Sequence, residues 1–374
     1  MRCRERALAE GHVAAATLAG LPDLTPARLR ALVDHFGGPV EALAAVRRGL
    51  GAAYLATRVR ADHRDALARA AASWPGLADP ARVAAQLAAR GTTVWLDGEP
   101  GYPILDEVPG RPYVVLAEGR REARVLDAPR VAVVGTRAAT PHGLADAHDL
   151  GAHLAASGIT VVSGLAIGID AAAHEGALEA GGPVVGVVAT GLDGEYPRRH
   201  TTLYRRVRAA GLVLGETGFG VRPSPKRFPV RNRIIAALAD VVVVVEATRR
   251  GGARITAEYG AQYGRPVFAV PGSRRNASAE GTNALLADGA EVLLDWSDVV
   301  VALGLTPAAR RAAPARPAPS APGRRVLDAL AGEPASPELL ASRTALPPEG
   351  VAMAVAELER GRWVRRDRGW VWPC

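Results

Sequence analysis

Apolar runs alternate with helical stretches between residues 129 and 304. Within each run the apolar residues are continuous, which is typical of strands that are covered on both faces. The stretches between the runs carry apolar residues at helical spacing. The runs occupy residues 131–134, 159–162, 184–188, 212–214, 241–245 and 267–270. This alternation predicts an α/β domain with a doubly wound, mostly parallel sheet.

Residues 1–67 predict a small helical domain. Thr25 and Pro26 supply a helix cap and a first helical residue. The glycine pair at 37–38 ends that helix, and a second begins near Pro39. Two short helices around a glycine turn resemble SAM-like or helix-hairpin-helix modules, which can bind the DNA backbone through turn amides. A packing domain explains the pattern equally well, because the turn lacks a clear basic cluster.

Two segments connect the predicted domains. Residues 68–128 form a transitional segment leading into the sheet, with strands expected near Val94 and Tyr113 and turns between them. Residues 305–323 are rich in proline and alanine, which predicts an extended, semi-rigid linker.

Residues 324–374 predict a winged-helix domain. Helices are expected over 325–330, after a cap at Ser336 and over 348–360, followed by a hairpin. Winged helices often bind DNA through their third helix. Here the third helix is acidic and alanine-rich, which suits phosphates poorly. A protein-interaction role is therefore favoured over DNA binding for this domain, with both left open.

Positive charge dominates the composition. The formal net charge is +8 and the isoelectric point is about 10.1. Lys226 is the only lysine among the 46 basic residues. Such an excess predicts attraction to DNA, RNA or an anionic membrane surface. A genome rich in G and C explains the same abundance of arginine and alanine, so the position of the arginines decides between the two.

The cysteines and the longest apolar runs exclude several classes of protein. Cys3 and Cys374 lie at opposite ends of the chain and fit neither a disulfide framework nor a metal site. No uninterrupted apolar run reaches the roughly 20 residues of a membrane helix, and the N-terminus is a poor signal peptide. We therefore expect a soluble cytoplasmic protein without a cofactor or a metal.

Glycine and arginine follow the first predicted strand, at the edge where open α/β sheets bind ligands. The residues in question are Gly135, Thr136 and Arg137. Glycine lets the backbone turn tightly beside an anion, and the planar guanidinium of Arg137 suits a phosphate or a base.

A second glycine turn follows the second strand. Ser163, Gly164 and Gly168 precede a helix whose N-terminus favours anions. Asp170 is expected to cap that helix and serve a structural role. His174, one turn into the helix, is interpreted as a packing histidine in preference to a catalytic base.

The densest positive charge lies in residues 222–233, where four arginines and the lysine surround one aromatic ring. Cations interleaved with an aromatic residue suit single-stranded nucleic acid, because the cations can bind its phosphates and the ring can stack on a base. The alternative is a solvated loop with the ring packed inward. The residues expected to contact DNA here are Lys226, Arg227, Phe228, Arg231, Asn232 and Arg233.

Arg249 and Arg250 extend the pattern after the fifth strand, which ends at a structural Glu246. Asp193 and Glu195 follow the third strand, where turn chemistry explains them. No nucleophile–base pair accompanies these segments. Together they predict a groove for a polyanion rather than a reaction centre.

In this order the segments resemble the DprA (Smf) family. Its most specific motifs are Ser-Gly-x-Ala-x-Gly-Ile-Asp, at 163–170, and Phe-Pro-x-Arg-Asn-Arg, at 228–233. The resemblance covers residues 130–295 strongly, and the helical N-terminus and winged-helix tail match the usual family layout.

The resemblance implies an extended Rossmann-like core that forms a homodimer. It further implies that the protein binds single-stranded DNA, protects incoming strands during natural transformation and loads RecA. By position, Arg137 and the loop 226–233 match the DNA-contacting residues of the family, and the turn at Ser163, Gly164 and Gly168 matches the segment that approaches phosphates.

Two hypotheses from other classes remain. Residues 250–258 resemble the Pro-Gly-Gly-x-Gly-Thr-x-x-Glu motif of Rossmann-like nucleoside-monophosphate phosphoribohydrolases, although they lack its proline and third glycine. That alternative would make Glu258 catalytic. The second hypothesis is a protein-interaction scaffold that uses the helical domains at the two ends of the chain. It predicts no salt-dependent DNA affinity, whereas phosphate contacts would make DNA affinity fall as the salt concentration rises.

Overall fold

The computed structural model describes residues 9–104, 107–119, 125–306, 317–361, 363–367 and 369–373. The chain divides into two compact units, Met1–Pro307 and Ala308–Cys374. Both cysteines, and residues 307–316 of the predicted linker, lie outside the described residues.

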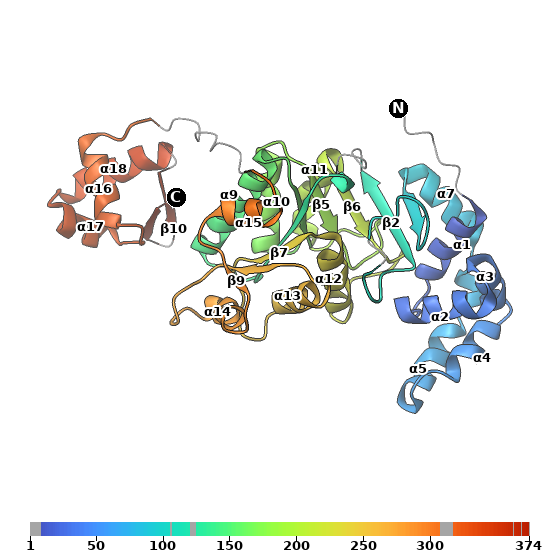
Figure 1. Ribbon diagram of the computed structural model, residues 1–374. Helices are drawn as coiled ribbons and strands as arrows, with labels where there is room; N and C mark the ends of the chain where they lie inside the picture. The colour runs from blue at the N-terminus through green and yellow to red at the C-terminus, as the bar shows by residue number, and fades with distance from the viewer. Residues whose placement is uncertain are drawn as a thin grey trace. The chain divides into compact units, whose positions relative to one another are not determined.

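A nine-stranded sheet forms the centre of the first unit (Figure 1). Its strands run in the order β1-β2-β6-β5-β4-β3-β7-β8-β9. From β6 to β9 all neighbours pair in parallel, whereas β1 and β2 are antiparallel. The bounds are Thr93–Leu96 (β1), Val114–Gly119 (β2), Arg130–Val134 (β3), Thr160–Ser163 (β4), Val184–Val187 (β5), Leu212–Gly215 (β6), Val241–Val244 (β7), Val267–Ala269 (β8) and Glu291–Val292 (β9). The predicted doubly wound, mostly parallel sheet is confirmed.

Helices cover both faces of the sheet, so each strand contributes alternate residues to two cores. Val131 and Val133 of β3 enter one core, while Ala132 and Val134 enter the other. In Figure 1, α9 and α10 lie on one side of the sheet and α12 to α14 on the other. The bounds are Pro141–Ala156 (α9), Ile169–Glu179 (α10), Thr201–Ala210 (α11), Arg227–Leu238 (α12), Gly252–Gln262 (α13), Glu280–Ala287 (α14) and Trp296–Ala302 (α15).

The strand order reverses at β3. This strand pairs with β4 on one side and with β7 on the other, because the chain builds β4, β5 and β6 outward before it returns. The loops after β3 and β7 therefore diverge and leave a crevice at the carboxyl edge of the sheet. Such a topological switch point is the usual ligand site of open α/β sheets.

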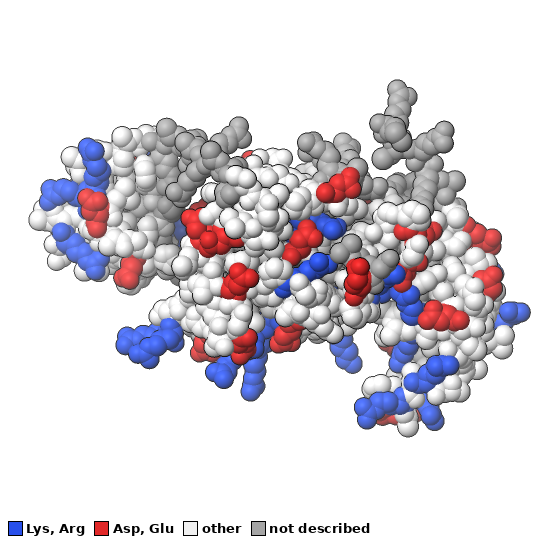
Figure 2. Space-filling view, in the orientation of Figure 1, with Lys and Arg blue, Asp and Glu red and all other residues white. Residues whose placement is uncertain are grey.

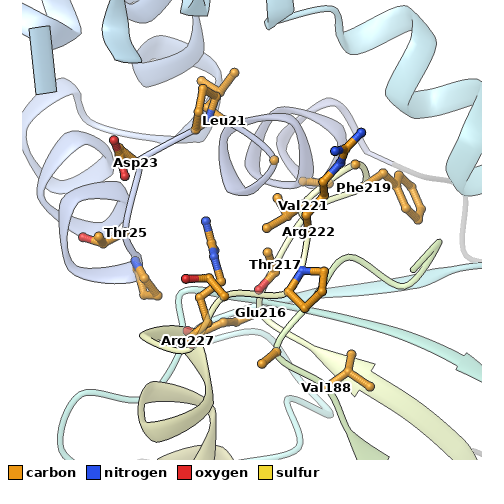
Figure 3. A pocket seen from close by; sticks show the side chains of 18 of the residues that line it. Leu21, Asp23, Thr25, Val188, Glu216, Thr217, Phe219, Val221, Arg222 and Arg227 are labelled. Carbon is orange, nitrogen blue, oxygen red and sulfur yellow. The ribbon is translucent and has the colours of Figure 1, made fainter. Parts of the chain in front are cut away.

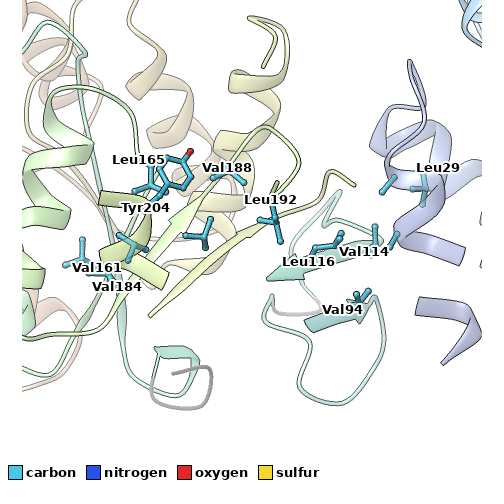
Figure 4. Close-up of a cluster of buried hydrophobic side chains, with 14 of the residues drawn as sticks. Leu29, Val94, Val114, Leu116, Val161, Leu165, Val184, Val188, Leu192 and Tyr204 are labelled. Carbon is cyan, nitrogen blue, oxygen red and sulfur yellow. The ribbon is translucent and has the colours of Figure 1, made fainter. Parts of the chain in front are cut away.

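Seven helices precede the sheet in the described part of the chain, and the first of them, α1, packs on β1 and β2. Thr25 caps α2 as predicted, since its hydroxyl accepts a hydrogen bond from the Arg28 N–H. The core is continuous from the sheet to α2, where Leu29 extends the buried cluster (Figure 4). The bounds are Glu10–Ala19 (α1), Pro26–Phe36 (α2), Pro39–Arg47 (α3), Leu50–Ala56 (α4), Ala61–Ala71 (α5), Trp74–Leu77 (α6) and Pro80–Arg90 (α7).

The structure differs from the domain boundaries expected at residues 67 and 129. The strands expected near Val94 and Tyr113 do form, but they extend the main sheet as β1 and β2 instead of making a separate transitional segment. A close backbone contact also joins the helices to the core, because a Cβ on Gly218 would lie 2.5 Å from the Gly20 nitrogen. The helices and the sheet thus form one unit.

The second unit contains three helices and a hairpin, which confirms the predicted winged helix. Ser336 caps α17 by accepting a hydrogen bond from the Leu339 N–H. The unit has its own apolar core, which includes Val326, Leu358 and Val371. The bounds are Ala321–Leu330 (α16), Pro337–Thr344 (α17), Pro348–Arg360 (α18), Val364–Asp367 (β10) and Trp370–Pro373 (β11). Within the described ranges, no helix has the length and apolar character to cross a membrane.

Separate cores predict separate unfolding transitions. Leu358→Ala and Leu150→Ala each remove a fully buried side chain, the first from the second unit and the second from α9. Each should destabilise its own unit by about 2–5 kcal/mol and leave the other unchanged. Scanning calorimetry of the two variants checks this; one shared transition, or a shift of both transitions by either variant, would contradict it.

Candidate nucleic-acid interface

A cleft of about 320 Å³ occupies the topological switch point. We call it the switch-point cleft. Its walls are the loop after β3, the first turns of α10 and α12, and the turn between β7 and α13. The sequence-predicted residues that line it are Gly135, Thr136, Arg137, Phe228, Arg231 and Asn232.

The predicted glycines bring two loops into backbone contact. Gly168 has a φ of 85°, and a Cβ there would lie 2.4 Å from the Thr136 carbonyl oxygen. A Cβ on Gly135 would lie 2.4 Å from the Ile169 side chain. At position 168 only glycine tolerates both the positive φ and the close approach of the Thr136 carbonyl. These glycines therefore set the position of the loop that carries Arg137.

Ser163 and Gly164 do not approach the surface, contrary to expectation. Ser163 is fully buried, and its hydroxyl donates a 2.6 Å hydrogen bond to the Val133 carbonyl. The guanidinium of Arg231 fills the space beside Gly164, where a Cβ would lie 2.2 Å from Arg231 Nη1. Both residues therefore form part of the wall behind the cleft and have no access to a phosphate.

Arg231 is a buried residue that joins three elements. It is 5 % exposed, and its Nη1 donates hydrogen bonds to the Gly164 carbonyl, at 2.7 Å, and to the Val187 carbonyl. These bonds tie α12 to the ends of β4 and β5. The expectation that Arg231 contacts DNA directly is corrected, because its guanidinium is enclosed; the residue positions α12.

Asp170 balances the charge of Arg231. Its carboxylate accepts a 3.0 Å hydrogen bond from the Gly164 N–H. Burial raises the pKa of Asp170, while the nearby Arg231 acts to lower it. The predicted capping role of Asp170 is wrong, because the residue at the N-cap of α10 is Gly168 and Asp170 lies inside the first turn.

Arg137, Phe228 and Tyr196 form an exposed cluster at the mouth of the cleft. The guanidinium carbon of Arg137 lies 4.8 Å from the centre of the Phe228 ring, and that ring is 5.6 Å from the ring of Tyr196. Phe228 is half-buried and Tyr196 is 43 % exposed. The ring of Phe228 thus contacts both a cation and a second ring, and Arg137 and Tyr196 beside it are exposed.

Further cations surround this cluster. Lys226 precedes α12 and is exposed, Arg227 begins that helix, and Arg249 and Arg250 are exposed on the turn after β7. On the face shown in Figure 2 basic and acidic side chains intermix, and basic ones project along the edge beneath α12 to α14. The basic residues beside the cleft are therefore notable for where they lie, beside an aromatic ring, and not for their number.

Two other predicted contact residues have partners within the protein. Asn232 Nδ2 donates a 3.0 Å hydrogen bond to the Gly252 carbonyl. Arg233 pairs with Glu216, whose side chain is buried, while the side chain of Arg233 is 12 % exposed. Burial raises the pKa of Glu216, and Arg233 opposes that shift. Asn232 and Arg233 therefore hold α12 in place, and Arg233 has no free face to offer DNA.

Glu246 holds the loop after β3. Its carboxylate accepts hydrogen bonds from the Thr140 N–H, at 2.8 Å, and from the Thr140 hydroxyl, at 2.5 Å. Its backbone carbonyl accepts another from the Thr136 N–H, at 2.7 Å. Arg137 lies between these two threonines, so Glu246 fixes the loop on both sides of it.

The groups considered for catalysis lie apart from the cleft. Glu258 is exposed on α13 and is not among the lining residues. His174 is fully buried, and burial lowers its pKa to about 3, so its ring is neutral at physiological pH. The described residues contain no cluster of His, Cys, Asp and Glu placed to hold a metal. The cleft offers cations and aromatic rings, which suit phosphates and bases.

Sequence comparison finds two family models. The model described as DNA recombination-mediator protein A matches residues 93–304, and that of the DprA winged helix domain matches residues 310–369. The chain is 41% identical to Protein Smf of Synechocystis sp., over 56% of this chain and 53% of that protein. It is 38% identical to the DNA processing protein DprA of Streptococcus pneumoniae, over 54% of this chain and 73% of that protein. The match thus spans only about half the length of the Synechocystis protein.

The solved structures that resemble the chain include two of DNA processing protein A. The X-ray structure of DNA processing protein A from Streptococcus pneumoniae aligns with a TM-score of 0.59 and 30% identity, over 77% of this chain and 95% of that one. DNA processing protein A from Helicobacter pylori aligns with a TM-score of 0.50 and 28% identity, over 57% and 95%. The latter structure concerns the single-stranded-DNA-binding mode of that protein.

The buried position of Arg231 predicts a stability effect. Arg231→Ala leaves the Asp170 carboxylate buried without its cation and two carbonyls without their donor, so it should lower the free energy of unfolding by about 3–5 kcal/mol. Urea denaturation measures this. The exposed Arg137→Ala is the matched control, expected to cost no more than about 1 kcal/mol. Equal unfolding midpoints for Arg231→Ala and the wild type would refute the structural role.

Proposed function

The chain belongs to the DNA recombination-mediator protein A family, and we propose that it binds single-stranded DNA at the switch-point cleft and acts as a recombination mediator. The observation that carries this proposal is the cluster of Arg137, Phe228 and Tyr196 at the mouth of the cleft. The relative from Helicobacter pylori, whose structure concerns single-stranded DNA binding, supports it.

The cluster suits a strand whose bases are unpaired. A base can stack on the Phe228 ring, and Arg137 can bind the adjoining phosphate or stack on the same base. Lys226, Arg249 and Arg250 are exposed nearby and extend the positive surface for further phosphates. In a duplex the bases are already stacked and paired, so the ring has no base face to bind.

The buried contacts make this surface rigid before DNA arrives. Arg231, Asn232 and Arg233 fix α12, and Glu246 fixes the loop that carries Arg137. A binding surface that is already ordered loses little conformational entropy when it binds. We propose a binding surface that does not turn over a substrate, and the position of Glu258, exposed and outside the cleft lining, gives no support to the phosphoribohydrolase alternative.

The wider role follows from family membership. A recombination mediator transfers single strands to a recombinase, so RecA is the proposed protein partner. The proposed setting is DNA uptake in natural transformation, where incoming strands need protection. The winged helix belongs to the same family layout, and its acidic third helix favours a protein contact.

We further propose that the chain forms a homodimer through the β9 edge. This strand ends the sheet, so its outer edge is open within the described part of the chain. Val292 of β9, Leu294 just after it and Val301 of α15 are 47 %, 80 % and 61 % exposed. Open strand edges and exposed apolar patches are usually covered by a partner, and a second copy can cover both.

The dimer proposal predicts that Leu294→Asp shifts the chain toward monomer, because the charge would be buried at the interface. Analytical ultracentrifugation measures the mass. Leu50→Asp, on the exposed face of α4, is the control and should leave the mass unchanged. An unchanged mass for Leu294→Asp would contradict an interface at this edge.

The strand-binding proposal predicts distinct effects for the ring and the cation. Phe228→Ala should weaken binding of oligo-dT by about 1–3 kcal/mol through lost stacking. Arg137→Ala should weaken binding and reduce the slope of log affinity against log salt by about 0.7. Fluorescence anisotropy measures both, with the exposed Arg69→Ala of α5 as the control. Wild-type affinity in both cleft variants would place the binding surface elsewhere.

A further inference from the structure

A second cleft separates the N-terminal helices from the sheet. It has a volume of about 760 Å³ and lies at the carboxyl ends of β5 and β6. Figure 3 shows Leu21, Asp23 and Thr25 on the helical wall, across from Thr217 and Arg222 on the core wall. We call it the inter-module cleft. No residue of α7 was expected to contact a ligand, yet this helix forms part of the wall.

Positive charge predominates in this cleft. Arg82, Arg222, Lys226 and Arg227 line it, and none of them forms an ion pair with a described residue. The acidic residues of the lining are Asp23 and Glu216. Glu216 is already paired with Arg233. The lining therefore has an excess of unpaired guanidinium and ammonium groups, which suits an anion.

Apolar and polar groups between these cations suit bases. Leu77 and Val230, on opposite walls, are 44 % and 39 % exposed, so both present apolar surface to the cleft. The Oε1 of Gln86 is buried in the lining and has no hydrogen-bond partner within the described residues. A base offers an apolar face to Leu77 and Val230, whereas the Oε1 of Gln86 is closed to solvent and lies behind this surface. Alternating cations and apolar faces are what a single strand requires.

The two clefts meet at the first turn of α12. Lys226 and Arg227 line the inter-module cleft, while the next residue, Phe228, lines the switch-point cleft. Residues of a helix rise by only about 1.5 Å each, so the two linings are contiguous. Val230 lines the inter-module cleft and Arg231 is among the residues that line both. A ligand too long for the first cleft therefore has the second directly beside it.

We propose that the single strand continues from Phe228 across the first turn of α12 into the inter-module cleft. There Arg82 of α7 contacts a phosphate, and Leu77 and Val230 contact the bases. This inference rests on the proposed function and adds the helical module to the DNA-binding surface. It does so through α7, and not through the glycine turn at 37–38 that the sequence pattern suggested.

The test compares two strand lengths in the full chain. A short oligo-dT of about six nucleotides fits one cleft, whereas one of about twenty spans both. Arg82→Glu should weaken binding of the long strand about five- to tenfold and leave the short strand unaffected, because reversing one phosphate-contacting charge removes attraction and adds repulsion. Leu77→Ser should show the same selectivity for length. Fluorescence anisotropy gives both affinities.

The control is a charge reversal at a site remote from both clefts. Arg64→Glu makes the same charge change on the exposed surface of α5, outside the lining of either cleft, and should leave both affinities unchanged. Arg82 and Leu77 are exposed, so thermal melting of the variants should match the wild type. Unchanged long-strand binding in both variants overturns the inference, and the cleft would then serve another anion, such as an acidic peptide or a free nucleotide. Failure of the wild type to bind the short strand would instead overturn the proposed function.

Discussion

The enclosed guanidinium of Arg231 is the contact on which the proposed interface depends. Its hydrogen bonds to the Gly164 and Val187 carbonyls join the ends of β4 and β5 to α12, and Asp170 compensates its charge. A buried cation is costly unless a countercharge and hydrogen bonds compensate it. Here the charge of Asp170 and two backbone carbonyls supply that compensation, while Nε has no partner among the described residues. The consequence is a fixed first turn of α12. That turn carries Phe228 into the switch-point cleft and the cations before it toward the helical module.

The sheet topology explains why the binding groups converge. Because β3 pairs with both β4 and β7, the loops that follow β3 and β7 separate at the carboxyl edge. The first of these loops, held by Glu246, presents Arg137, while α12 brings Phe228 to it and the loop after β5 places Tyr196 beside that ring. Helix α1 packs on β1 and β2 of the same sheet and α7 packs on α1, so α7 borders the inter-module cleft. A groove that extends over both modules follows from this arrangement.

Much of the fold was predictable from local patterns. Continuous apolar runs identified the six central parallel strands, and hydroxyl caps identified the starts of α2 and α17. The pattern could not show that β1 and β2 join the main sheet, since antiparallel pairing at its edge depends on contacts distant in sequence. The inter-module cleft had no local signature either, because Arg82 and Arg222 are brought together only by the packing of the helices on the sheet.

Within the site, the sequence identified the segments but not the direction of each side chain. In the basic segment 222–233, Arg231 is buried, whereas the other arginines are exposed or half-exposed. One signal was available: Arg231 lies three and four positions before Ile234 and Ile235, on the core face of a helix. Ser163 shows the same limit, because a hydroxyl beside a glycine suits a phosphate and a buried carbonyl equally. Tyr196 was missed since its place beside Phe228 results from tertiary packing.

The most direct measurement of the central claim is the affinity of the wild-type chain for labelled oligo-dT and for a duplex of equal length, followed by fluorescence anisotropy across a range of salt concentrations. Stacking on Phe228 and phosphate contacts at Arg137 predict tighter binding of the single strand, with log affinity falling linearly with log salt. Equal or tighter binding of the duplex, or affinity that does not depend on salt, would contradict the account.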